Sequence, residues 1–303
     1  MTHDLMMEAG LSLERLHTFC LIAEAGGITK AAGGDETRQP LFSRQLKELE
    51  TYFATELVRR TGRGVTLTAE GKRLHQLVRN SLAALGDFKR DCAGQPSELN
   101  VGAGDSIIQW LLLPTLGKAR KTLSFARLSF HNLRTQEIAD RVAEGLMDLG
   151  VVRKDAVTAR LKSVALGRLE YALYVPRRLL RSEKMPKWQE VLLCVPLALL
   201  AGEGQFRQEL EKAAAAAGVD LTVAVECSSF PSVARALHGG GLAAILPTLA
   251  ESEFSSSETV RVPLPWASKL ARDMALVWSP RVAGIRTVIP RAVESLARLW
   301  RIG

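Results

Sequence analysis

Four polar side chains within residues 39–47 have the types and the spacing needed to hydrogen-bond to nucleic acid. Gln39, Ser43, Arg44 and Lys47 share one face if this stretch is helical. A glutamine amide can form two hydrogen bonds with adenine, and an arginine can do the same with guanine or hold a phosphate. Pro40 offers an apolar surface to a thymine methyl group, and Ser43 offers a hydroxyl to a phosphate or a base. The pattern therefore predicts a helix that lies in the major groove of DNA.

The apolar residues between these polar ones predict the helix itself, over residues 39–53. They are spaced by four, three and four residues and comprise Phe42, Leu46, Leu49 and Phe53. This spacing turns one side of a helix toward a core. Pro40 falls in the first turn, where a missing N–H breaks no hydrogen bond.

Two shorter helices are predicted ahead of this one. An apolar period near 3.6 residues predicts a helix over residues 13–25, which a Gly-Gly pair ends. A short helix follows with Thr29 near its start, and the Gly-Gly-Asp sequence at 33–35 breaks the pattern. We expect Thr29 and Lys30 to contact the backbone of the opposite DNA strand.

Residues 57–68 predict a hairpin. Two short β-favouring pieces flank a tip rich in Arg and Gly, which is typical of a wing. Arg60 and Arg63 would reach flanking phosphates or the minor groove. Any one of these polar residues, taken singly, fits a solvated surface position equally well. The full set of candidate DNA-binding residues is Thr29, Lys30, Arg38, Gln39, Pro40, Ser43, Arg44, Lys47, Arg60 and Arg63.

A long helix is predicted from Thr68, which can cap it, to about residue 91. Its apolar stripe consists of Leu74, Leu77, Val78, Leu82, Leu85 and Phe88. Intervals near 3.5 residues suit pairing with a second copy of the chain, although the same stripe could pack on its own domain. The sequence at 93–97, Ala-Gly-Gln-Pro-Ser, is the clearest linker in the chain.

After this linker the pattern changes to alternating strands and helices. Strands are predicted at 99–103, 127–131 and 149–152, and helices at 107–121 and 136–144. A βαβαβ order predicts a parallel sheet. A second α/β stretch follows, with strands at 171–175, 222–226, 242–246 and 274–278 and helices at 206–217, 232–237 and 285–300.

Composition narrows the class of protein. The 303 residues carry a net charge of +8, and residues 1–95 hold 13 Lys and Arg against 12 Asp and Glu, so net charge does not single out the basic helix. The sequence shows neither a run of about 18 apolar residues nor the order of a secretory signal, so we expect a cytoplasmic protein without a membrane span. The cysteines and histidines are scattered, and the catalytic motifs of common enzymes are missing. We therefore expect no metal, no cofactor and no catalytic residues.

The order and spacing of residues 13–71 resemble those of the LysR-type transcriptional regulators. The residues that carry the resemblance are Leu16, Phe19, Ala23, Glu24, Gly26, Thr29, Ala31, Ala32, Gln39, Pro40, Ser43, Arg44, Gln45, Leu46, Leu49, Glu50, Leu57, Arg60, Thr61, Gly62, Arg63, Gly64, Leu67, Thr68 and Gly71. The glycine-rich run at 239–247, which ends in Ile-Leu-Pro, is similar to a turn in the family's second subdomain. The resemblance implies a homodimer or homotetramer that binds a double-stranded DNA operator and a small-molecule effector.

Three departures from the family's pattern precede the predicted reading helix. Gly27 and Arg38 stand where family members usually carry Ser, and Asp35 stands where they carry Leu. Gly27 loses a side-chain cap. Asp35 puts a carboxylate where an apolar side chain is normally buried, which is costly unless the backbone has rearranged. We therefore expect a short second helix and an altered turn.

The resemblance also implies an effector cleft between two α/β subdomains. Its implied lining residues are Asp105, Ser106, Asn132, Arg134, Thr135, Ser229 and Phe230. Ser106 and Thr135 lie near helix N-termini, which favour anions, and Arg134 could grip a carboxylate with two hydrogen bonds. We expect a small effector that carries a carboxylate, although Asp105 would repel an anion. The two hydroxyls fit a role as simple helix caps equally well.

The sequence therefore predicts an α/β protein with an N-terminal all-α winged helix-turn-helix and a C-terminal two-subdomain periplasmic-binding-protein-like α/β fold. The expected domains are a DNA-binding domain (1–68), a linker, dimerisation helix and hinge (69–97), and an effector-binding domain (98–303), with subdomain I at 98–168 plus 269–303 and subdomain II at 169–268. The expected function is effector-dependent regulation of transcription, without enzyme activity. The alternative is a cytoplasmic small-molecule-binding protein or α/β enzyme whose N-terminal helices only dimerise. A regulator with a vestigial pocket is a third reading.

Overall fold

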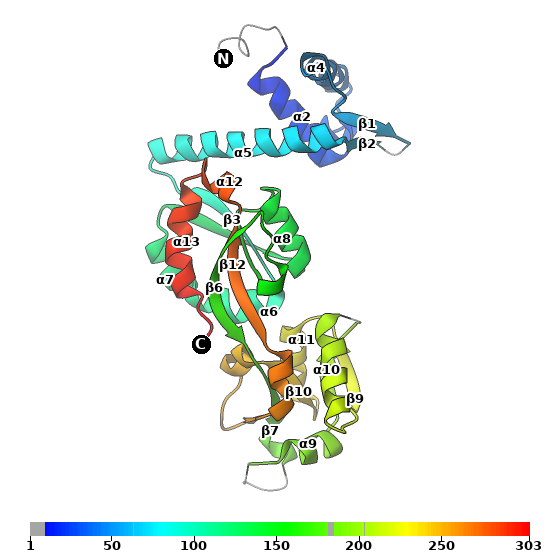
Figure 1. Ribbon diagram of the computed structural model, residues 1–303, viewed down its shortest axis with the longest axis vertical. Helices are drawn as coiled ribbons and strands as arrows, with labels where there is room; N and C mark the ends of the chain where they lie inside the picture. The colour runs from blue at the N-terminus through cyan, green and yellow to red at the C-terminus, as the bar shows by residue number, and fades with distance from the viewer. Residues whose placement is uncertain (1–9, 63, 181–184, 203) are drawn as a thin grey trace. The chain divides into compact units, whose positions relative to one another are not determined.

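The computed structural model describes residues 10–62, 64–180, 185–202 and 204–303. It divides into two units, Met1–Gly94 and Gln95–Gly303 (Figure 1). The first unit combines helices with a two-stranded hairpin, and the second unit holds two five-stranded sheets with helices on their faces. The predicted fold class is confirmed.

Helices α2 (Leu13–Ala25), α3 (Ile28–Ala31) and α4 (Arg38–Tyr52) form the helix-turn-helix of the first unit. The Ser12 side chain caps α2 by accepting a hydrogen bond of 3.2 Å from a backbone N–H of the first turn. Gly26 ends α2 with a left-handed φ of +67°, a conformation that glycine adopts without strain. The shared core of these helices consists of Phe19, Cys20, Ile22, Leu46, Leu49, Leu57 and Val78.

The predicted wing is present as strands β1 (Val58–Thr61) and β2 (Gly64–Leu67), which pair antiparallel. The backbone N–H of Val65 donates to the carbonyl of Gly26 at 2.9 Å and so docks the hairpin on the end of α2. A side chain at Gly64, where φ is +150°, would collide with the same carbonyl. Glycine is therefore required at this close approach.

Helix α5 (Ala69–Cys92) starts at Thr68, whose hydroxyl accepts a hydrogen bond from the backbone N–H of Gly71 at 2.9 Å, as predicted. Val78 is buried in the core of the first unit, and Leu74 and Leu82 pack against that core. The remaining large apolar residues of the stripe are exposed, at 60% for Leu77, 54% for Leu85 and 69% for Phe88. The stripe thus has one buried side and one open side within the described residues.

Two lobes make up the second unit, each with one sheet. The sheet of lobe I has the order β4-β3-β5-β12-β6. Its strands are β3 (Ser97–Ala103), β4 (Ala126–Asn132), β5 (Leu149–Arg153), β6 (Lys162–Leu169) and β12 (Arg272–Trp278). The parallel pairing of β3 with β4 and β5 confirms the βαβαβ prediction. Strands β12 and β6 are antiparallel additions, so the sheet is mixed and not parallel throughout.

The sheet of lobe II has the order β11-β7-β10-β8-β9. Its strands are β7 (Tyr171–Pro176), β8 (Leu197–Leu200), β9 (Val223–Cys227), β10 (Ala243–Pro247) and β11 (Thr259–Val262). Strands β8, β9 and β10 are parallel to their neighbours in this group, whereas β7 is antiparallel to β10 and β11. Strands β6, β8 and β11 were not predicted from the sequence.

The helix predicted at 107–121 is broken into four parts. They are α6 (Asp105–Ile107), a π-helical turn (Ile108–Leu112), a 3-10 turn (Leu113–Thr115) and α7 (Leu116–Thr122). Pro114 lies within the 3-10 turn, where its missing N–H interrupts regular helical bonding. The other helices of this unit are α8 (Thr135–Ala143), α9 (Trp188–Cys194), α10 (Gln205–Ala216), α11 (Phe230–Gly239), α12 (Pro280–Ala283) and α13 (Val288–Leu299).

The two lobes are joined by two short crossings of the chain. Only Glu170 separates β6 of lobe I from β7 of lobe II. The chain returns through a 3-10 turn (Pro265–Leu270) and Ala271, after which β12 begins. Lobe II is therefore inserted between two neighbouring strands of the lobe I sheet.

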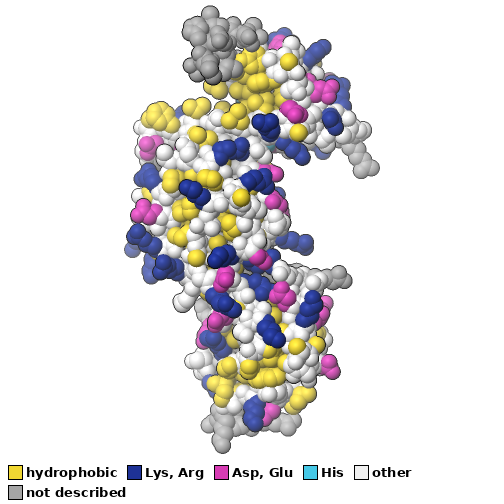
Figure 2. Space-filling model, viewed as in Figure 1, with side chains coloured by type: hydrophobic (Ala, Val, Ile, Leu, Met, Phe, Trp, Pro, Cys, Tyr) yellow, Lys and Arg dark blue, Asp and Glu magenta, His cyan; other side chains and the backbone are white. Residues whose placement is uncertain are grey.

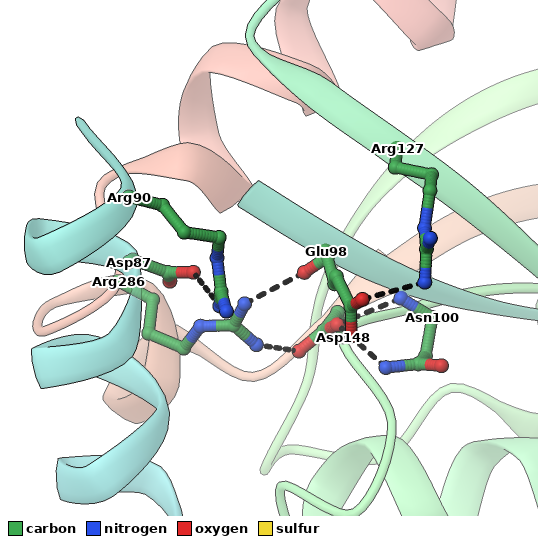
Figure 3. Close-up of polar contacts among 7 residues, drawn as sticks. All are labelled: Asp87, Arg90, Glu98, Asn100, Arg127, Asp148 and Arg286. Atoms are coloured by element: carbon green, nitrogen blue, oxygen red, sulfur yellow. Dashed lines mark hydrogen bonds and ion pairs between the residues drawn. The ribbon is translucent and has the colours of Figure 1, made fainter. Parts of the chain in front are cut away.

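A buried ion pair ties together the end of lobe I at which β3 and β5 begin (Figure 3). The Arg286 guanidinium contacts the Asp148 carboxylate, and both side chains are less than a tenth exposed. Arg286 also donates to the carbonyl of Glu98 at 2.8 Å, and Asp148 accepts a hydrogen bond of 2.7 Å from the backbone N–H of Asn100. Further hydrogen bonds around both charges meet part of the cost of removing them from water.

Candidate DNA-binding and effector sites

Helix α4 presents the predicted polar residues opposite its buried side. Arg38, Pro40, Arg44 and Lys47 are exposed, and Gln39 and Ser43 are half-buried. Leu46 and Leu49 are buried on the other side, at 5% and 0% exposure. Since the core fixes one side of the helix, the exposed polar side is held outward as a unit.

Thr29 and Gln39 come together from two helices. The hydroxyl of Thr29 donates to Oε1 of Gln39 at 3.2 Å, which joins α3 to the first turn of α4. This contact uses the amide oxygen and leaves the amide NH₂ group to donate elsewhere. Lys30, next to Thr29, is exposed.

Arg44 is pre-oriented by an acidic neighbour. Its Nε lies 3.2 Å from Oε1 of Glu48, and Oε2 of the same carboxylate lies 2.6 Å from Nε of Arg15. The Arg44 side chain is 71% exposed, so its other nitrogens face solvent. Arg44 can therefore hold a second acceptor while Glu48 keeps it in place.

Gln45 has a structural role. Its side chain is buried, accepts a hydrogen bond of 2.7 Å from the hydroxyl of Thr18, and donates to Glu14 at 3.0 Å. These bonds fasten α4 to α2. Gln45, which was not among the predicted DNA-binding residues, is thus held inside the domain, although it lies next to Arg44 in the sequence.

The turn before α4 has the altered shape expected from the sequence. Gly33 and Gly34 adopt φ values of +65° and +81°, and Asp35 is exposed and not buried. The Asp35 carboxylate accepts hydrogen bonds from the Thr37 backbone N–H at 2.8 Å and from its hydroxyl at 2.7 Å. These two bonds lower the pKa of Asp35. The backbone has rearranged, so the carboxylate avoids the burial that its position in the sequence suggested.

Arg38 follows this turn and contacts the carboxylate of Asp35. Its Nε lies 3.5 Å from Oδ2 of Asp35, and both side chains are largely exposed. The backbone N–H groups of Arg38 and Gln39 point to the carbonyl of Asp35, at 3.2 and 3.3 Å. Arg38 was among the predicted DNA-binding residues, whereas its contact with Asp35 and the hydrogen bonds from Thr37 to Asp35 were not predicted.

The wing contributes Arg60, which is exposed on β1 and pairs in register with Val65. Arg59, beside it, is also exposed and was absent from the predicted set. Arg63, the other predicted wing residue, lies outside the described residues.

The predicted effector residues of lobe I gather at the edge where its parallel strands end. Asp105 and Ser106 follow β3, whereas Asn132 ends β4 and leads to Arg134 and Thr135 at the start of α8. Since β3 and β4 are neighbours, the two groups lie side by side. The carboxyl edge of parallel strands is where ligands bind in open α/β sheets.

The two hydroxyls at this edge are not helix caps. Neither α6 nor α8 has a side-chain cap, and within the described part of the chain Ser106 Oγ and Thr135 Oγ1 form no hydrogen bond. Both side chains are half-buried. Both hydroxyls are therefore available to a ligand. This favours the hypothesis that they bind an effector over the alternative that they cap helices.

The predicted effector residues of lobe II lie at the start of α11. Ser229 caps α11, its hydroxyl accepting from the Ser232 N–H at 3.3 Å, and Phe230 begins the helix. Helices α11 and α6 pack together, so the structure brings Ser106 and Phe230 to one region. The Ser229 hydroxyl is partly committed to its own helix.

Three aromatic rings, those of Tyr171, Phe206 and Phe230, cluster near the crossing between the lobes, and only Phe230 was predicted from the sequence. The Tyr171 ring stacks on Phe206 at 4.8 Å between centroids, and Phe206 meets Phe230 edge-on at 4.9 Å. Tyr171 packs against the cores of both lobes. Burial raises the pKa of Tyr171 to about 12, with Arg272 and Arg153 opposing the shift.

Two arginines bridge the lobes beside these rings. Arg153, at the end of β5, contacts Gln205, and Arg272, at the start of β12, contacts Glu209. Arg153 follows the third parallel strand of lobe I, so the strand-end rule that identified Asn132 could also have identified it.

Trp110 anchors lobe I in lobe II. It lies in the π-helical turn of lobe I, yet its ring is buried in the apolar cluster of α11 and β10. Its indole N–H donates to Oε1 of Glu253 at 2.8 Å. A π-helical turn shifts the side chains of a helix out of regular phase, and here it directs this ring into the neighbouring lobe.

Other classes of site were also sought. Among the described residues, no three His, Cys, Asp or Glu side chains gather as metal ligands. The same residues include no helix long and apolar enough to span a membrane.

The fold and the exposed face of α4 define a winged helix-turn-helix protein with a two-lobed ligand domain. Comparison with known families agrees. Residues 13–72 match the bacterial regulatory helix-turn-helix proteins of the lysR family, and residues 93–289 match the LysR substrate binding domain. The chain belongs to the LysR family of transcriptional regulators.

Individual relatives are distant. The chain is 30% identical to a probable RuBisCO transcriptional regulator of Thalassiosira pseudonana over 162 residues, which is 51% of this chain and 52% of that protein. A second such regulator, from Cyanophora paradoxa, is 25% identical over 77% of this chain and 75% of its own length. The chain thus spans about half the length of the first relative.

Solved structures share the whole fold. A full-length OxyR variant from Pseudomonas aeruginosa has a TM-score of 0.67 at 20% identity and covers 97% of this chain and 96% of its own. Full-length CbnR in complex with its target DNA has a TM-score of 0.61 at 21% identity, with 95% and 99% covered. LysG of Corynebacterium glutamicum with bound effector Arg has a TM-score of 0.58 at 17% identity, with 94% and 99% covered.

Proposed function

We propose that this protein reads a DNA operator with α4 and regulates transcription in response to a small molecule. The observation that carries the proposal is the face of α4, where Gln39, Arg44 and Lys47 lie opposite the buried Leu46 and Leu49. Helices of this kind contact bases in the major groove. On the wing, Arg60 would contact the DNA backbone that flanks these bases. We propose the same role for Arg63 from its position in the sequence.

Mobility shifts with DNA from upstream of the protein's own gene test this proposal. Gln39→Ala and Arg44→Ala should each weaken specific binding by about tenfold or more, because each good bidentate base contact contributes about 1–3 kcal/mol of discrimination. Lys187→Ala, an exposed cation of lobe II, is the control and should bind normally. Unchanged binding by both α4 variants would falsify the assignment of this helix as the reader.

The proposed assembly is a homodimer through α5, or a homotetramer built on it. Leu77, Leu85 and Phe88 leave an apolar stripe exposed on α5, and such a stripe at coiled-coil spacing suits a second copy. A dimer would place two reading helices on two half-sites. Leu85→Glu with Phe88→Glu should yield monomers in sedimentation and lose operator binding, whereas a monomeric wild type would refute the assembly.

The proposed effector carries a carboxylate and binds between the lobes. Ser106 and Thr135 offer free hydroxyls there, and Arg134 is exposed beside them. Asn132, Ser229 and Phe230 complete the proposed lining, and Asp105 opposes an anion. A calorimetric screen of carboxylates, amines and sugars decides the point. Binding of amines or sugars alone would contradict the carboxylate, and no binding at all would favour a vestigial pocket.

The remaining proposals concern where and how the protein works. We expect it to act in the cytoplasm, without a cofactor and without enzyme activity, through double-stranded DNA and a small effector. The membership of the chain in a regulator family supports this reading over an α/β enzyme with a helical dimerisation domain. Such an enzyme would bind its substrate but would not shift DNA.

A further inference from the structure

The positive charge of the chain is concentrated in one lobe. Lobe I, residues 95–169 and 271–303, contains 17 Lys and Arg against nine Asp and Glu. Lobe II, residues 170–270, contains 10 against 11, and residues 1–94 contain 13 against 12. The entire net charge of +8 is therefore matched by the excess in lobe I, outside the region proposed to read bases.

Six of the 17 cations of lobe I lie on the face covered by α7 and α13. These helices pack together and cover one face of the sheet, with Ala119, Ala292 and Leu296 buried in the core beneath. Their exposed cations, together with one residue just beyond α13, are Lys118, Arg120, Lys121, Arg291, Arg298 and Arg301. Figure 2 shows Lys and Arg side chains along the flank that these helices occupy. We name this set the α7–α13 surface.

Acidic residues do little to neutralise this surface. The two helices contain one acid, Glu294, which pairs with Arg298 at 3.4 Å. Within the described part of the chain Lys118, Arg120, Lys121 and Arg301 form no ion pair. The guanidinium of Arg291 lies over the ring of Phe125, 4.0 Å from its centroid, which holds this cation in place at the end of α7.

Helix α8, on the opposite face of the same sheet, is organised differently. It carries Glu137 and Asp140 with a single cation, Arg141, which pairs with Glu137 at 2.7 Å. An ordinary solvated helix has this mixture of both signs. The α7–α13 surface therefore differs in charge from the helix on the other face of the same sheet.

We propose that the α7–α13 surface binds the phosphate backbone of DNA and adds a second, sequence-independent contact to the one made by α4. Lys and Arg without acidic partners attract a polyanion and displace its counterions. The cores of protein–protein interfaces are depleted in Lys, Asp and Glu, although Arg is enriched there. A surface made almost wholly of cations fits a polyanion better than an acidic protein, which is the second candidate.

This inference rests on the proposed operator binding. Residues 1–94 are almost neutral, so they supply little long-range attraction to DNA. Once α4 holds an operator, flanking DNA stays at a high effective concentration around the rest of the chain. Even contacts that are weak in isolation then contribute to affinity.

The test compares two full-length triple variants. Lys118→Gln, Arg120→Gln and Lys121→Gln remove three charges from α7 and keep good helix formers. Lys187→Gln, Lys212→Gln and Lys269→Gln remove three exposed cations from lobe II, none of them ion-paired in the described part of the chain, and serve as the control. Binding is measured from 50 to 200 mM salt with the operator alone and with the operator extended by about 30 base pairs on each side.

With the extended DNA, the α7 variant should reduce the slope of log affinity against log salt by about two to three, since each phosphate contact contributes about 0.9. Its affinity should fall by about tenfold or more, and the control should match the wild type. An unchanged slope overturns the inference. A reduced slope also overturns the inference if sedimentation shows that the variant has changed its oligomeric state. The surface would then be an interface between copies of the chain. A wild type that binds neither DNA refutes the proposed function instead.

Discussion

The first unit and the second unit build their candidate sites in opposite ways. In the first, the residues proposed to read bases come mainly from one helix, and 15 consecutive residues contain most of them. In the second, the proposed effector residues and the side chains that bridge the lobes come from segments as far apart as Ser106 and Arg272. The geometry of a site on one helix depends on the small core that the helix packs against. The geometry of a site made by two lobes depends on the contacts that join the lobes.

The buried ion pair of lobe I gives the largest expected difference between the units. Arg286→Met leaves the Asp148 carboxylate buried without its main partner and should destabilise the second unit by about 3–5 kcal/mol. The first unit should keep its own stability, because its core contains neither residue. Calorimetry should show one transition moving down by several degrees and the other unchanged.

The double variant Arg286→Met with Asp148→Leu is the control. Because it removes both charges, it should recover much of the loss. If both transitions move together in the single variant, the two units unfold as one and the comparison fails.

Trp110 tests the link between the lobes. Trp110→Phe keeps an aromatic ring in lobe II but loses the hydrogen bond to Glu253, and should cost about 1–3 kcal/mol. Trp278→Phe, a half-buried indole within lobe I, is the comparison and should cost less. Urea unfolding followed by circular dichroism measures both, and equal losses would argue against Trp110 as the anchor.

His75 should make the stability of the first unit depend on pH. Burial lowers the pKa of His75, with Glu24 opposing the shift, and its ring packs edge-on against Phe19. Below the unfolded pKa of about 6.5 the unfolded chain binds a proton that the folded chain resists, so stability falls as the pH drops. The melting temperature of the first unit should decrease between pH 7.5 and 5.5. His75→Gln should flatten this dependence, and an equally steep profile in the variant would contradict it.

Substitutions in the turn before α4 should have the smallest effect, a loss of operator binding. Asp35→Ala removes the acceptor for both Thr37 bonds and frees Arg38, which should weaken operator binding by a few-fold while the fold stays intact. Asp35→Asn keeps an acceptor and should fall between the wild type and the alanine variant. Glu36→Ala, an exposed neighbour, is the control. Fluorescence anisotropy measures all three, and tighter binding by Asp35→Ala would show that the carboxylate mainly repels DNA.

The sequence predicted the first unit well because its signals are local. The period of Phe42, Leu46 and Leu49, the cap at Thr68 and the Arg- and Gly-rich hairpin each lie within a short stretch. The sequence also predicted an altered turn at Asp35, but not how the turn keeps the carboxylate exposed. The position indicated burial, and only the left-handed backbone of Gly33 and Gly34 shows how the carboxylate escapes it.

The second unit was predicted in outline and missed in its long-range parts. Strand β6 has no clean alternation, contains Gly167 at φ +123°, and is defined by pairing with β12 more than 100 residues later. The bridging pairs Arg153–Gln205 and Arg272–Glu209 likewise join residues whose proximity no spacing reveals. Sequence patterns predict elements, and the contacts between distant elements follow only from the topology.

The insertion of lobe II into lobe I also sets an order of events during synthesis. All strands of lobe II lie within residues 171–262, so they are available for folding as soon as that segment leaves the ribosome. Lobe I must wait for β12, for the fully buried Trp300, and for Ile302, whose backbone N–H bonds to Leu166 at 2.6 Å. A nascent chain would therefore carry a finished lobe II beside an open edge of the lobe I sheet until residues 272–302 are added. Addition of these residues closes that edge and protects the protein from aggregation.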